Sequence, residues 1–109
     1  MDDHDFQMKA AEAIEDLEAA LDPVSEQHGF ETEASGGMLI LIFEEPAPAK
    51  FIVSPNGPAR QIWVSALSTS FKFDWDDGSA GFVLEKTREP FRSVIAGLVS
   101  RQLHTPITL

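Results

Sequence analysis

A long acidic region at the start of the chain could bind metal cations. Lys9 is the only lysine or arginine among residues 1–45, whereas acids recur throughout this region. The acids expected on the outer side of the first helix and just beyond it are Asp5, Glu12, Glu15, Asp16, Glu18, Asp22, Glu26, Glu31 and Glu33. Carboxylates are hard ligands that suit Fe²⁺, Fe³⁺, Mn²⁺ or Ca²⁺ weakly. The alternative is a merely solvated helix face, although such faces usually mix both signs.

A second candidate site is the segment PARQIWVSA, residues 58–66. In a strand, Ile62 and Val64 point to one face and Trp63 to the other. If the two aliphatic residues face a core, Trp63 lies on an open sheet face and resembles a protein–protein anchor. Neighbouring strands would add three isoleucines to that face: Ile40, Ile42 and Ile52. The alternative is that the parity of one strand is wrong and Trp63 belongs to the core.

Composition excludes several classes of function. Eighteen acidic against eight basic residues give a net charge of −10, so we expect no nucleic-acid or membrane partner. The absence of cysteine excludes disulfides, zinc–thiolate sites and a self-held iron–sulfur cluster. No signal or transit peptide is visible in MDDHDFQMKA, which predicts a cytoplasmic protein. The length of 109 residues predicts a single domain, 1–109.

No arrangement of side chains indicates an enzyme. His4, His28 and His104 are dispersed and read as surface residues, and no nucleophile stands beside a base. The segment 74–78, DWDDG, superficially resembles a calcium-binding loop, but its glycine falls one position early and its flanks read as strands. We therefore interpret it as a hairpin turn.

Hydrophobic periodicity predicts one helix, a run of short strands and a second helix. The first helix runs from Asp3 to about Leu21, with a short extra turn to Gln27 possible despite Pro23. The five or six strands are expected at 30–34, 38–43, 50–54, 58–66, 71–75 and 82–85. The second helix begins at Pro90, and the apolar tail 105–109 should pack against the helices. The result is an α/β two-layer sandwich with both helices on one face of an antiparallel sheet.

Several segments together resemble the frataxin family, in particular its bacterial branch. They are SPNGPARQIWVS at 54–65, FDW at 73–75, DDHDF opening an acidic helix, SGGMLILIFE at 35–44, Phe91 heading the last helix and the PIT tail at 106–108. The resemblance covers essentially the whole chain.

This resemblance implies a non-enzymatic regulator of iron–sulfur cluster assembly. It would bind Fe(II) or Fe(III) weakly on an acidic ridge and dock on the cysteine desulfurase and scaffold complex, remaining monomeric without iron. The ridge residues would be Asp3, Glu18, Asp22, Glu31 and Glu33, with Glu15 from the same helical stripe. The partner-binding residues would be Trp63, Gln61, Arg60, Ile40, Ile42, Ile52 and Ser54.

The chain also departs from the family pattern. Pro23, Ser25, Gln27 and Gly29 stand where bacterial relatives often carry acids. Ser54 replaces an asparagine, and Phe82 replaces a frequent tryptophan, which leaves the details of scaffold contacts open. Two alternatives remain: a metal-independent interaction domain using the open sheet face, and a weak iron oxidase. The oxidase would need an inward-facing Glu/His cluster, which we do not find in the sequence.

Overall fold

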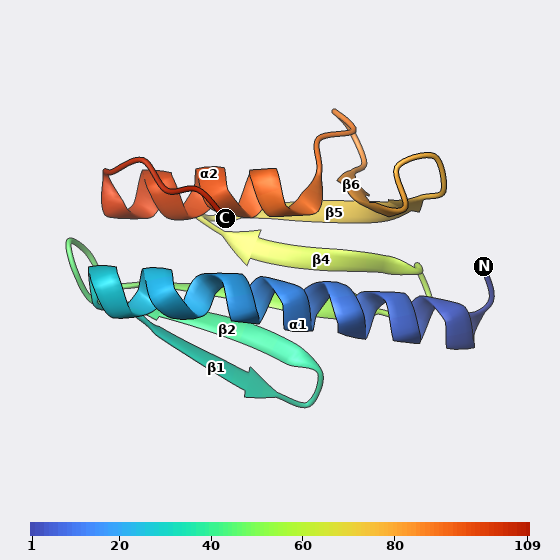
Figure 1. Cartoon of the computed structure of the whole chain (residues 1–109), viewed down its shortest axis with the longest axis horizontal. Helices are drawn as coiled ribbons and strands as arrows, with labels where there is room; N and C mark the ends of the chain where they lie inside the picture. The colour runs from blue at the N-terminus through green and yellow to red at the C-terminus, as the bar shows by residue number, and fades with distance from the viewer.

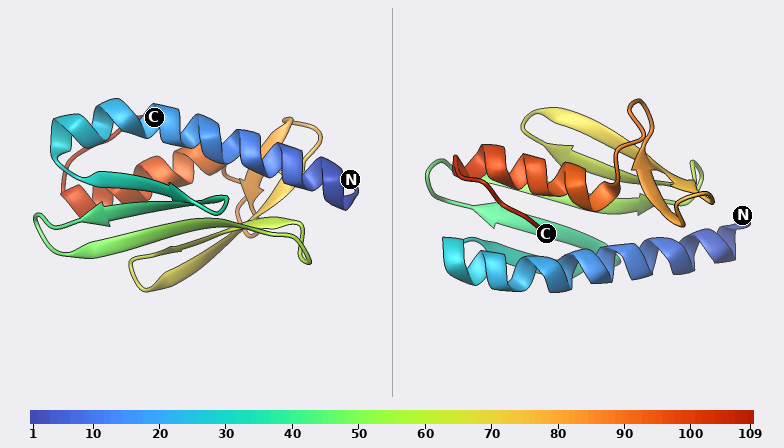
Figure 2. Two further views of the ribbon diagram at one scale, coloured as in Figure 1. Left: turned by 90° about the horizontal axis from the view of Figure 1, so that it is seen from below. Right: turned by 45° about the horizontal axis from the view of Figure 1, so that its top comes forward.

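Two helices lie side by side on one face of a six-stranded antiparallel sheet (Figures 1 and 2). The computed structural model describes residues 1–109. Its elements are α1 (Asp3–His28), β1 (Glu31–Ser35), β2 (Met38–Phe43), β3 (Ala49–Asn56), β4 (Gln61–Ala66), β5 (Thr69–Asp76), β6 (Gly81–Leu84) and α2 (Phe91–Leu103). The strands follow one another across the sheet in sequence order, β1-β2-β3-β4-β5-β6. The predicted two-layer α/β sandwich is therefore confirmed.

Helix α1 is longer than its predicted end at about Leu21. It continues through Pro23 to His28 and ends at Gly29, whose φ of 75° is the left-handed conformation that glycine adopts readily. Proline cannot donate the usual helical hydrogen bond, but Pro23 is exposed, so water can reach the carbonyl left without a partner. Buried Leu21 and partly buried Val24 hold both sides of the proline against the core. Packing thus outweighs the local preference of the residue before proline.

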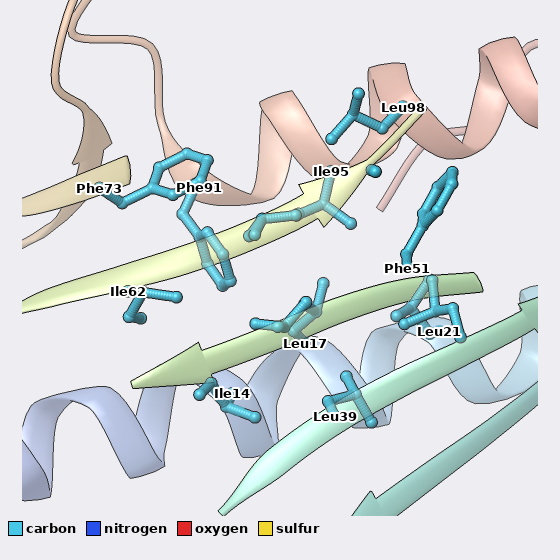
Figure 3. Packing of buried hydrophobic residues seen from close by; sticks show 14 of the residues in the cluster. Ile14, Leu17, Leu21, Leu39, Phe51, Ile62, Phe73, Phe91, Ile95 and Leu98 are labelled. Carbon is cyan, nitrogen blue, oxygen red and sulfur yellow. The ribbon is translucent and has the colours of Figure 1, made fainter. Parts of the chain in front are cut away.

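The core fills the space between the helices and the inner face of the sheet (Figure 3). Along β2 the side chains alternate between half-buried and buried, so that Leu39, Leu41 and Phe43 face the helices. From the helices, Leu17 and Ile95 meet this face and are almost fully buried. The rings of Phe73 and Phe91 join β5 to α2, with centroids 5.0 Å apart and near-perpendicular planes. This single cluster of 20 buried residues stabilises both layers at once.

Several boundaries differ from the prediction by one to three residues. The turn between β4 and β5 is tight, with Leu67 and Ser68 both at positive φ, so β5 begins at Thr69. The sequence predicted a break here, between strands at 58–66 and 71–75, but not its two-residue length, because leucine and serine are unusual in such a turn, which normally uses asparagine and glycine. Pro90 occupies the N-cap position of α2 and does not lie inside the helix.

The C-terminal tail packs as expected. Ile107 and Leu109 are partly buried against the core, and the backbone N–H of Ile107 donates to Ser100 Oγ at 2.9 Å. The tail runs back along α2 toward α1 (Figure 2). Neither helix combines the length and apolar character needed to cross a bilayer.

The start of α1 predicts a specific acid sensitivity. Asp2 caps the helix, and the hydrogen bond from the Asp5 backbone N–H lowers the pKa of the Asp2 carboxyl below its ordinary value of 3.8. A lowered folded-state pKa stabilises the fold at pH values above the ordinary pKa. This contribution is lost as the pH falls through the folded-state pKa. Asp2→Asn keeps a capping oxygen but cannot titrate.

We therefore expect the melting temperature of Asp2→Asn to fall less steeply than that of the wild type between about pH 5 and pH 2.5. Asp2→Ala should melt lower than both at neutral pH because it loses the cap. Thermal melts followed by circular dichroism would check this. Parallel pH profiles for the wild type and Asp2→Asn would contradict the lowered pKa of Asp2.

Candidate functional site

The sheet face turned away from the helices, hereafter the outer face, carries the predicted anchor residues together. Directly opposed residues of antiparallel strands share a face, and the register pairs Ile40 with Ile52 and Ser54 with Trp63. The same face continues on β5, where Lys72 lies opposite Trp63. The three isoleucines of this face, Ile40, Ile42 and Ile52, are half-buried.

Trp63 is the large apolar side chain most open to water on the outer face, with 37% of its surface exposed. Its indole Nε1–H donates to Gln61 Oε1 at 2.9 Å. The Nζ of Lys72 lies 5.0 Å from the ring centroid, within range of a cation–π interaction. A hollow of about 420 Å³ opens beside the ring, lined in part by Ile52, Ser54 and Lys72. A partner side chain could therefore pack against the indole edge without moving the sheet.

Gln61 differs from the expectation of an accessible partner contact. It lies on the outer face but is only 8% exposed. Its Nε2 donates to Asp74 Oδ1 at 2.9 Å and to Glu85 Oε2 at 2.8 Å, while its Oε1 accepts from Trp63. These bonds engage both ends of the carboxamide, and little of Gln61 is accessible to a partner. Its main contact on this face is therefore the hydrogen bond from Trp63.

The other positions singled out in the sequence differ in their surroundings. Arg60 is exposed in the turn before β4, at a φ of 51°. Ser54 is half-buried directly opposite Trp63. Phe82 lies on the inner face, 4% exposed, with its ring centroid 5.3 Å from that of Trp75 and 6.2 Å from that of Phe6. Phe82 is therefore a core residue and takes no part in the outer face.

The structure distributes the predicted metal ligands over two surfaces. Glu15 and Glu18 of α1 line one hollow with the β1–β2 turn. Glu31 and Glu33 are instead on the outer face, opposite Ile42 and Ile40, and both are exposed. The two other candidates, Asp3 and Asp22, are exposed near opposite ends of α1.

These acids do not converge on one point. No group of three or more His, Asp or Glu side chains is close enough to hold a metal ion. The residues therefore do not fit a closed, resident metal site, which needs several oxygen ligands at once. What the arrangement can offer is a field of negative charge along α1 and β1, with single or paired carboxylates for loosely held cations.

Four residues of the outer face did not enter the sequence-based site: Lys72, Asp74, Glu85 and Arg88. Strand parity alone would have found Lys72 and Asp74, because they alternate with Phe73. Glu85 and Arg88 follow β6 in a loop, and only the fold brings Glu85 to Gln61 of β4 and Arg88 to Asp74 of β5.

Comparison with known families and proteins identifies the family of this chain. The frataxin-like domain profile covers residues 1–105. This chain belongs to the frataxin family. Curated relatives named iron-sulfur cluster assembly protein CyaY include that of Pseudomonas putida, 34% identical over 98 residues, covering 88% of this chain and 81% of the relative. The protein of the same name from Dechloromonas aromatica is 37% identical over 79 residues, covering 72% of each chain.

A solved structure of frataxin from Psychromonas ingrahamii superposes with a TM-score of 0.76, covering 99% of this chain and 97% of that chain. At 20% sequence identity this likeness concerns the fold. The two proteins therefore share the two-layer fold described above.

The contrast between the two faces predicts different costs of truncation. Trp63→Ala should lower the free energy of unfolding by about 1 kcal/mol, because the indole is already partly in water and leaves no enclosed cavity. Phe73→Ala, which empties a fully buried position on the adjacent strand, should cost about 3 to 5 kcal/mol. Urea unfolding of both variants would measure this. Equal losses would place Trp63 in the core.

Proposed function

We propose that this frataxin-family protein acts in cytoplasmic iron–sulfur cluster assembly as a non-enzymatic docking protein. The observation that carries the proposal is the exposed Trp63, held by a hydrogen bond and a cation–π contact on a sheet face that no helix covers. Apolar surface of this kind favours burial against a partner. The curated relatives of similar length are named iron-sulfur cluster assembly proteins.

The proposed partners are the cysteine desulfurase and the scaffold protein of the assembly complex. The outer face around Trp63, with Ile40 and Ile52, would supply a largely apolar contact. The acids of α1 and β1 would supply a separate electrostatic contact to a basic surface. Exposed charge pairs are screened by salt, whereas apolar burial is not, so the two contacts should respond differently to ionic strength.

Iron enters the proposal as a loosely bound cation. The carboxylates of Glu15, Glu18, Glu31 and Glu33 are hard oxygen ligands, and their separation supports weak, exchangeable association. A metal-independent interaction domain is the second candidate, and the absence of any cluster of three ligands favours it.

The electrostatic contact can be tested by charge reversal on α1. We expect Glu18→Lys plus Asp22→Lys to weaken binding to purified cysteine desulfurase by at least tenfold at low salt, an order-of-magnitude estimate for losing attraction and adding repulsion. The difference from wild type should shrink as salt rises. Fluorescence titration over a salt series would measure both effects.

A matched control lies on the same helix. Glu12→Lys plus Asp16→Lys has the same spacing and the same change in net charge, but these acids face the groove toward α2. This control should bind nearly as well as the wild type. Equal weakening by both double variants would show a general charge effect and would contradict a specific acidic contact.

The two candidate functions differ in their response to iron. Under anaerobic conditions, paramagnetic Fe²⁺ should broaden the amide NMR signals of β1 and of α1 between Glu15 and Asp22. Signals near Lys72 should keep their widths, because β5 lies four strands from β1 and the Lys72 side chain carries positive charge. If about 1 mM Fe²⁺, a concentration suited to weak sites, broadened no signals on α1 or β1, the metal-independent alternative would replace the iron-binding one.

A further inference from the structure

The β6–α2 loop, residues 85–90, reaches across to the outer face beside the anchor. Glu85 Oε2 accepts from Gln61 Nε2 at 2.8 Å, although the two residues are 24 positions apart in sequence. Asp74 Oδ1 accepts from the same nitrogen at 2.9 Å. The loop therefore contributes directly to the group that holds the Trp63 indole.

The chemistry of these partners defines the orientation of the Gln61 carboxamide. An ionised carboxylate only accepts hydrogen bonds and an indole N–H only donates. The amide nitrogen must consequently face Asp74 and Glu85, and the amide oxygen must face Trp63. A rotated amide would lose all three bonds. Because Gln61 is 8% exposed, water has little access to replace them.

Arg88 offsets part of the negative charge of the carboxylates in this network. Its guanidinium lies 3.8 Å from Asp74 Oδ2 and 3.4 Å from Asp76 Oδ1. Asp74 thus uses one oxygen for Gln61 and turns the other toward Arg88. Lys72 stands at the other end of the network, over the Trp63 ring.

The loop itself is well held. The backbone N–H of Glu85 donates to the Lys72 carbonyl at 2.9 Å, and that of Arg88 donates to the Leu84 carbonyl at 2.8 Å. Val83 pairs with Pro90 as an isolated bridge and is only 5% exposed, although its register with Asp74 places it on the outer face. The loop therefore covers the β6 end of the outer face and leaves the Trp63 region open.

We propose that Glu85 and Arg88 are positioning residues for the Trp63 anchor. They orient the Gln61 carboxamide, which holds the indole in one direction before a partner arrives. A contact that is ordered in advance costs less conformational entropy on binding. The lower entropy cost on binding rests on the proposed docking function. The ordering of the indole does not, since it is a property of the free protein.

The test uses the two indole N–H groups of the chain. Trp75 Nε1 donates to Asp77 Oδ1 at 2.7 Å, apart from this network, and serves as an internal reference. In ¹⁵N-labelled free protein, Glu85→Leu should speed hydrogen exchange of the Trp63 indole by about fivefold, the order expected for one lost hydrogen bond. The indole ¹H–¹⁵N NOE of Trp63 should fall in parallel, with Trp75 unchanged in both measurements.

Two further variants sharpen the result. Glu85→Gln keeps an acceptor oxygen and should restore exchange to within about twofold of wild type. Arg88→Gly removes the guanidinium at a residue whose φ of 67° suits glycine, and should speed exchange by about twofold, as for an exposed ion pair. Unchanged Trp63 signals in Glu85→Leu, or equal changes at Trp75, would overturn the proposal; unchanged signals in Arg88→Gly would overturn its Arg88 part.

Binding separates this inference from the proposed function. Glu85→Leu should weaken binding to purified cysteine desulfurase–scaffold complex in the wild-type background and add nothing in a Trp63→Ala background. Faster exchange of the Trp63 indole in Glu85→Leu with unchanged binding would contradict the anchor function and leave the positioning role intact. Unchanged indole exchange, with binding that still depends on Trp63, would contradict the positioning role and leave the anchor function intact.

Discussion

One-sided burial of the sheet is the constraint on which the rest of this structure depends. Both helices pack on the same face, and side chains alternate strictly along each strand, so every strand sends half of its residues into one core and half away from it. The inner half carries the phenylalanines and aliphatic residues that close the core. The outer half is free of that packing requirement, which is why it can carry an exposed tryptophan.

That freedom creates a second problem, because a large ring on an open sheet has few neighbours to hold it. Two polar contacts hold the ring. The buried Gln61 carboxamide accepts a hydrogen bond from the Trp63 indole, and the Lys72 ammonium lies over the ring. No buried side-chain nitrogen or oxygen is left without a partner, so the polar support carries no desolvation penalty from unmade bonds. The resulting anchor is exposed yet ordered.

The acids of α1 are separated from this anchor. The acids of α1 lie on the helix layer, and the outer face carries Lys50 and Lys72 among its apolar residues. Strand β1 joins the two surfaces, because Glu31 and Glu33 project from the edge of the outer face. A partner could thus meet acidic and apolar surfaces along one continuous edge, with each contact responding to different solution conditions.

Much of the fold could be predicted from local pattern. Ile62, Trp63 and Val64 alternate with the two-residue period of a strand. This pattern correctly placed the tryptophan on the outer face. Boundaries were less predictable where tertiary contacts overrule local preference. Helix α1 continues past Pro23 because its apolar face stays packed, and the turn at Leu67 and Ser68 follows from strand pairing and not from typical turn residues.

The sequence by itself determined the layer order, the acidic character of α1 and the side of the sheet on which Trp63 lies, because these depend on short-range periodicity and composition. Only the tertiary structure decided that Gln61 is buried, that Glu85 accepts a hydrogen bond from it and that Arg88 pairs with Asp74, since these contacts join segments far apart in the chain. It also decided that the acids spread over two surfaces without forming a metal site. Periodicity specifies the face on which a side chain lies, whereas its neighbours across the sheet depend on how strands and loops are brought together.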